Sequence, residues 1–179
     1  MGMRIVSLSK DELLRLLKVA KAHSEQDWLL ICTSFWHGLR ASEAITIIGK
    51  DIQDGYLTVE RLKGSEKTCQ RLVVSSDPLL SEQEAIEKLC ACIDGPLFPI
   101  CRQHAWRLVQ KYGKLAGIPA HKLHPHIFKH SLAHHCIDGG MKIHDLKKYL
   151  GHKNLSSTGA YLESDDETAS KAMFAAVGV

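Results

Sequence analysis

The spacing of apolar side chains changes in the middle of this chain, and that change limits the folds it can adopt. Residues 9–48 carry apolar side chains at helical spacing, whereas Tyr56–Leu62 and Gln70–Ser75 alternate apolar or β-branched residues with polar ones. The polar loop Lys63–Thr68 joins the two alternating stretches, which predicts an antiparallel hairpin. Helical spacing then resumes. We therefore predict one mostly helical α+β domain with a small antiparallel β-sheet.

Start and stop signals mark the predicted helices. Ser9 and Glu12 have the spacing of a capping box, and Gly38 follows the second, strongly apolar helical segment. The pair Gly139 and Gly140 ends a later helix in the same way. The predicted helices cover residues 10–20, 25–36, 42–48, 78–92, 103–116, 128–138, 144–149 and 156–162, with a tail helix from about 167.

Composition places the chain among ordinary globular domains. It has 179 residues, of which 45% are hydrophobic and 24% charged, so disordered, fibrous and coiled-coil classes are excluded. No apolar run approaches the roughly 20 residues of a membrane-spanning helix, and the first residues do not read as a signal peptide. We expect a cytoplasmic protein that does not bind membranes. The net charge of +3 permits an anionic partner without requiring one.

Cysteine and histidine spacing argues against a metal centre. Without a secretory signal, the six cysteines are expected to be reduced thiols. Only Cys90 and Cys92 are close in sequence, and one such pair alone is a poor zinc signature. His130 and His134 have a spacing that could ligate zinc, but no acidic or thiol partner stands at a matching distance. We predict no metal and no cofactor.

Several polar residues stand outside these patterns in a definite order. Arg40 lies in Gly-Leu-Arg-Ala-Ser-Glu, Lys63 in the hairpin, and His126 in His-Ile-Phe-Lys. His152 ends Leu-Gly-His, and Tyr161 follows nine residues later. In this order, and over nearly the whole chain, these motifs resemble the catalytic domain of the tyrosine recombinases, the phage-integrase family.

The resemblance implies site-specific cleavage and rejoining of DNA through a 3′-phosphotyrosyl intermediate, without metal or ATP. It makes Tyr161 the nucleophile, and a phenol of pKa about 10 needs nearby positive charge to attack at neutral pH. The planar guanidinium of Arg40 suits two phosphate oxygens. By analogy Lys63 protonates the leaving 5′ oxygen. His126 and His152 would flank the phosphate as hydrogen-bond donors or proton shuttles.

Three further residues are candidates near this set. Glu43 follows Arg40 by three residues, where it could orient the arginine or simply favour the start of a helix. The comparison with the family supports the orienting role. Lys67 and Arg71 belong to the same hairpin as the candidate general acid, so they are plausible DNA phosphate contacts. A solvated turn explains these two equally well.

Lys129 departs from the family pattern, because family members carry an arginine three residues after the histidine of His-x-x-Arg. Lysine keeps the charge but loses the rigid, two-pronged donor geometry. Complete loss of a preorganised oxyanion donor costs roughly 2.7–4 kcal/mol, and retained charge should limit the loss to about half of that. The sequence leaves open natural tuning, decay and an engineered change.

The extent of the resemblance predicts the domain organisation. Many family members carry an N-terminal domain that clamps DNA, and nothing in residues 1–179 corresponds to it. We expect these residues to be the catalytic domain, either excised or belonging to a short, single-domain recombinase. Two alternative functions stay open: a DNA-binding regulator that has lost efficient cleavage, and DNA relaxation like that of type IB topoisomerases.

The expected partners are double-stranded DNA and further copies of the chain. Residues 163–179 combine an acidic stretch with a helical stripe of small apolar residues, which predicts a C-terminal arm. In the family the corresponding helix packs on a neighbouring protomer in a tetrameric synapse; docking on its own domain is the alternative. The stripe is too small for the ~1,000 Å² of a stable interface, so we expect a monomer in free solution.

Overall fold

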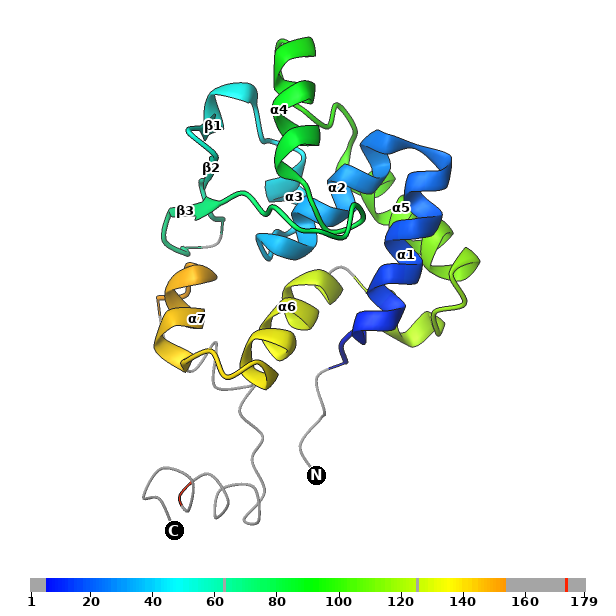
Figure 1. Ribbon diagram of the computed structural model, residues 1–179, viewed down its shortest axis with the longest axis vertical. Helices are drawn as coiled ribbons and strands as arrows, with labels where there is room; N and C mark the ends of the chain where they lie inside the picture. Colours follow the sequence, from blue (N-terminus) through cyan, green and yellow to red (C-terminus); the bar gives the residue numbers. More distant parts are fainter. Residues whose placement is uncertain (1–5, 63, 125, 154–172, 174–179) are drawn as a thin grey trace.

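The computed structural model describes residues 6–62, 64–124, 126–153 and 173. Figure 1 shows a mostly helical molecule with a small sheet at one side, which confirms the predicted α+β class. The elements are α1 (Lys10–His23), α2 (Glu25–Trp36), α3 (Ala41–Ala44), the 3-10 turn η1 (Gly49–Asp51), β1 (Ile52–Gln53), β2 (Tyr56–Val59), β3 (Thr68–Arg71), α4 (Gln83–Cys92), α5 (Arg102–Leu115), the 3-10 turn η2 (Ala120–Lys122), α6 (Ile127–Asp138) and α7 (Ile143–Tyr149).

The apolar helix α2 forms the centre of the core. Most of its side chains are buried, including Trp28 and Phe35, and it packs against α1 and α6. Burial of each such side chain contributes about 1.5–3 kcal/mol to folding. Its C-terminal end is thereby held rigidly, and the chain that leaves this end carries Arg40. No helix within the described residues is long and apolar enough to cross a membrane.

The sheet has the strand order β1-β2-β3 and is antiparallel throughout. Tyr56 pairs with Arg71 and Val59 with Thr68, so the predicted hairpin is present. Its bounds were wrong, because β2 ends at Val59 instead of Leu62 and β3 covers Thr68–Arg71 instead of Gln70–Ser75. On β3 the inward-facing side chains, Thr68 and Gln70, are polar and buried. In Figure 1 this hairpin lies next to α7, which brings polar side chains toward the segment that precedes His152.

Helix signals at the start of the chain are confirmed. Ser9 Oγ accepts a hydrogen bond from Glu12 N at 3.2 Å, and Glu12 Oε2 accepts one from Ser9 N at 2.8 Å. The helix continues three residues past the predicted Ala20. The predicted helix at 42–48 is wrong beyond Ala44. Ile47 O accepts from Leu97 N and Ile48 N donates to the Asp51 side chain, and the 3-10 turn η1 begins at Gly49.

Tertiary contacts override local pattern before α4. This helix was expected from Pro78 but begins at Gln83. The carbonyl oxygens of Leu79 and Leu80 instead accept the indole N–H groups of Trp28 and Trp36, at 3.0 and 2.9 Å. Those contacts hold the segment in turns. The predicted helices at 156–162 and from 167 lie outside the described residues.

Candidate active site

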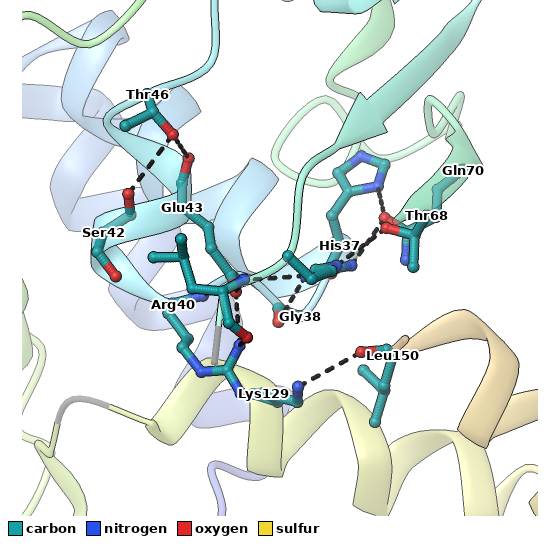
Figure 2. Close-up of polar contacts among 12 residues, drawn as sticks. His37, Gly38, Arg40, Ser42, Glu43, Thr46, Thr68, Gln70, Lys129 and Leu150 are labelled. Atoms are coloured by element: carbon teal, nitrogen blue, oxygen red, sulfur yellow. Dashed lines mark hydrogen bonds and ion pairs between the residues drawn. The ribbon is translucent and has the colours of Figure 1, made fainter. Parts of the chain in front are cut away.

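Arg40 is placed by a tight turn at the end of α2. Gly38 has φ +56°, and a Cβ at this position would lie 2.6 Å from Leu150 Cδ2. Glycine is therefore required both for the backbone conformation and for the close approach of α7. The turn ends at Arg40, the residue that precedes α3, and its side chain is 18% exposed. Figure 2 shows this turn above α6.

Glu43 is the buried anchor of the site. Its Oε1 accepts from Arg40 Nη1 at 2.5 Å and from Leu62 N at 3.1 Å, and its Oε2 accepts from Arg40 N at 2.9 Å and Arg61 Nη1 at 3.3 Å. Burial alone would raise the pKa of this carboxyl, but the hydrogen bonds from Arg40 and Leu62 and the charge of Arg61 hold it below its usual value. These contacts are those that an orienting role requires.

Lys129 projects from the first turn of α6 into the same place. It is only 5% exposed, and its Nζ lies 3.5 Å from the Leu150 carbonyl oxygen. Figure 2 shows its amino group beside the Arg40 guanidinium. Burial, followed by the nearby charges of Arg40 and Arg61, lowers the pKa of Lys129 to about 8. The lysine thus supplies a cation beside Arg40 that titrates near physiological pH.

His152 follows the turn that ends α7, and it lies close enough to Lys129 and Arg40 for their charges to act on it. Gly151 has φ +67°, and a Cβ there would lie 2.5 Å from Glu66 O. Burial, then the charges of Lys129 and Arg40, lowers the pKa of His152 to about 4. At pH 7 this imidazole is neutral, so it can donate one hydrogen bond and is a weak base.

His126 lies on the other flank, immediately before α6. It lines a pocket of about 440 Å³ together with Arg40, Arg102, Trp106 and Phe128. The pocket therefore opens beside the Arg40 guanidinium and the His126 imidazole. The predicted residues Arg40, Glu43, Lys129 and His152 meet in one cluster, and His126 borders it.

The flanks of the hairpin loop are tied to this cluster. Lys63 itself and Tyr161 lie outside the described residues. Leu62 N donates to Glu43, and Leu62 O accepts from Arg40 Nη1 at 3.3 Å. On the far side of the loop, Glu66 N donates to Gly151 O at 2.9 Å. Leu62 and Glu66, on either side of Lys63, are therefore attached to residues of the candidate site.

The two remaining hairpin candidates face solvent. Lys67 pairs with Glu60 at 2.5 Å, and both side chains are mostly exposed. The hydrogen bond and charge of Glu60 raise the pKa of Lys67. Arg71 is exposed at the end of β3. In the part of the chain that the structure describes, no three His, Cys, Asp or Glu side chains are placed to hold a metal ion.

Arg61 is a member of the cluster that the sequence reasoning missed. It reads as a surface residue beside the hairpin loop, yet its side chain is fully buried. The available signal was the alternation of the strand: Leu57, Val59 and Arg61 are two residues apart and all face inward.

The amino-acid sequence of the chain is similar to those of known proteins. Residues 7–168 match the sequence pattern of the Phage integrase family. The chain is 34% identical over 144 residues to the tyrosine recombinase XerD of Xanthomonas campestris pv. campestris, covering 69% of this chain and 43% of that protein. It is 31% identical over 166 residues to the tyrosine recombinase XerA of Pyrococcus furiosus, covering 87% and 56%. The chain thus spans about half the length of these relatives.

Solved structures show the same fold. A crystal structure of XerA recombinase superposes with a TM-score of 0.74 at 21% identity, covering 96% of this chain and 62% of that one. The catalytic domain of bacteriophage HP1 integrase gives a TM-score of 0.66 at 21% identity and covers 94% of each chain. At this level of identity the likeness extends to the fold alone.

Proposed function

The chain belongs to the phage integrase family, and from this premise we propose that it cleaves and rejoins DNA at specific sites through a 3′-phosphotyrosyl intermediate. The observation that carries the proposal is the cluster of Arg40, Lys129 and His152, organised by buried Glu43. It offers two cations and a neutral imidazole within one site. A phosphodiester that exchanges one oxygen substituent needs this kind of preorganised positive surroundings.

The chemistry follows from the roles available to each group. The phenolic oxygen of Tyr161 attacks phosphorus, and the bond from phosphorus to the 5′ oxygen breaks. Lys63 gives the leaving oxygen its proton, while Arg40 and Lys129 neutralise the non-bridging oxygens. His152, neutral at pH 7, donates a hydrogen bond to a non-bridging oxygen. The phenolic proton of Tyr161 passes to solvent. The new ester keeps the energy of the broken bond, so rejoining is the reverse reaction and needs no ATP.

The proposal extends to partners and organisation. Residues 1–179 act as the catalytic domain on double-stranded DNA, with His126, Lys67 and Arg71 as further contacts. Free copies are monomeric and cytoplasmic, and four assemble on paired sites through the arm at 163–179. Two XerH structures among the fold relatives are of that recombinase bound to its difH substrate, which supports DNA as the ligand.

Covalent capture tests this function directly. The chain is incubated with a pool of nicked duplexes that carry a randomised core, and DNA that stays attached to protein in SDS is recovered and sequenced. We expect adducts on an enriched sequence, since the nick releases the 5′ fragment and prevents rejoining. Binding without adduct would favour the regulatory alternative. Relaxation of plasmid DNA by single copies, without pairing of sites, would favour the topoisomerase-like alternative.

Binding is expected to depend strongly on salt despite the small net charge of +3. If Arg40 and Lys129 share the scissile phosphate, and Lys63, Lys67 and Arg71 each neutralise one further phosphate, log affinity should fall with log salt at a slope of about −4. Fluorescence anisotropy of labelled duplex between 50 and 300 mM salt (roughly the range over which counterion release is resolved) measures it. A slope near zero would contradict an extended phosphate track.

A further inference from the structure

The buried Arg61 guanidinium has an unusually complete set of partners. Nε donates to Thr68 Oγ1 at 2.9 Å, Nη1 to Gly38 O at 3.2 Å and to Glu43 Oε2 at 3.3 Å. Nη2 donates to His37 O at 2.7 Å and to Gln70 Oε1 at 3.2 Å. A guanidinium carries five N–H bonds, and here five acceptors receive them.

These acceptors join three separate parts of the fold. His37 and Gly38 form the turn that leads to Arg40, Glu43 lies on α3, and the other two acceptors lie on β3. A charge removed from water is tolerated only where its partners are complete, so the loss of any of these acceptors would destabilise the fold around Arg61. Arg61 therefore fixes the hairpin to the turn that carries Arg40, and we call these five hydrogen bonds the Arg61 clasp.

Arg61 is close in the chain to Lys63, the candidate proton donor. Lys63 follows two residues later. Between them, Leu62 donates from its backbone N to Glu43 and accepts at its carbonyl oxygen from Arg40. Because all five guanidinium donors are used internally and the side chain is fully buried, Arg61 has no donor left for DNA. Its effect on chemistry must pass through the residues that it holds.

We propose that Arg61 is a positioning residue for proton transfer, holding the hairpin so that Lys63 reaches the leaving 5′ oxygen. The proposal rests on the proposed function. In that step the bond from Tyr161 oxygen to phosphorus forms and the phenolic proton passes to solvent. The bond from phosphorus to the 5′ oxygen breaks, and the Lys63 ammonium gives its proton to the departing oxygen. Arg40 keeps its own hydrogen bonds to Glu43 from Nη1 and from its backbone N when Arg61 is changed, so loosening the clasp displaces the proton donor more than the phosphate contact.

A sulfur-substituted substrate separates this role from a general loss of structure. When the bridging 5′ oxygen is replaced by sulfur, the leaving group is a thiolate, which is stable without protonation because thiols have pKa values near 8.5. Cleavage of that DNA does not need Lys63. A defect in positioning the proton donor is therefore rescued by sulfur, whereas a defect at Arg40 is not.

The experiment compares adduct formation on oxygen and sulfur versions of the duplex recovered by covalent capture. Arg61→Met is expected to slow adduct formation about tenfold on the oxygen substrate, at the low end of the effect of a general acid. DNA affinity stays within about threefold, since phosphate contacts elsewhere supply binding. On the sulfur substrate its rate returns to that of the unmodified chain. Lys63→Ala shows the same split, and Arg15→Met, an exposed arginine on α1, is the matched control without a defect.

Thr68→Val provides a second variant with less risk to folding. It removes the acceptor for Nε and keeps the charge partners of Arg61, and thermal unfolding reports whether each variant is folded. A smaller defect on the oxygen substrate with rescue by sulfur supports the proposal. Equal slowing on both substrates, or no slowing by either variant, overturns it. An unmodified chain that forms no adduct on either DNA overturns the proposed function itself.

Discussion

Tyr161→Phe is expected to abolish the covalent protein–DNA adduct, lowering its rate of formation by at least about 10⁴-fold, the scale seen when a nucleophile is removed from an active site. DNA affinity should stay within about threefold, because cations elsewhere on the chain contact the phosphates. The phenylalanine variant keeps the ring and loses only the attacking oxygen. Denaturing gels of the captured duplex measure the adduct, and anisotropy measures the affinity.

The other tyrosines support this choice and supply the control. Tyr112 OH donates to Asp27 at 2.6 Å, and burial, followed by that carboxylate, raises the pKa of Tyr112 to about 12. Tyr149 OH donates to Trp36 O at 2.9 Å, and burial raises its pKa above the usual value. Both hydroxyls are poor nucleophiles. Tyr56 is exposed, so Tyr56→Phe is the matched control and should form adduct normally. Adduct from the Tyr161 variant would reveal another nucleophile.

Local pattern predicted the elements of the fold better than their boundaries. The capping box at Ser9 and the glycine at 38 were sufficient because each acts within one turn of chain. The start of α4 was misplaced because Leu79 and Leu80 give their carbonyls to indole groups of α2, far away in sequence. The strand β1 was missed because two residues carry almost no alternation.

The order of motifs predicted which residues form the candidate site, but it did not predict the hydrogen bonds and ion pairs among them. Nothing local shows that Glu43 receives hydrogen bonds from both Arg40 and the hairpin. Arg61 was overlooked because arginine is usually exposed, and burial becomes favourable only when distant acceptors complete its set. The lowered pKa of Lys129 likewise depends on tertiary burial and on two arginines, so sequence alone predicts its charge without its titration.

Lys129→Arg is expected to raise the cleavage rate at pH 7 about tenfold to a hundredfold, from the ~1–3 kcal/mol that a rigid two-pronged donor could add. The change should also remove a pH dependence. The pKa of Lys129 is lowered to about 8, mainly by burial, so the amine is protonated below that pH and loses its charge as the pH rises through it. Arginine stays charged throughout this range.

The ratio of the two rates isolates this effect from the titration of other groups. At limiting DNA the rate reports groups of the free protein. The advantage of the arginine variant should be constant below pH 7 and grow about tenfold per pH unit above pH 8, the slope expected for loss of one proton. Lys129→Met, which has no cation at any pH, should cleave slowly across the whole pH range, and its rate should not fall further above pH 8 through loss of this charge. A flat ratio across pH 6–9.5 (about two units to either side of this midpoint) would mean that Lys129 does not act as a cation in cleavage. A slower arginine variant would mean that the buried space beside Gly38 and Leu150 has adapted to the thinner lysine side chain.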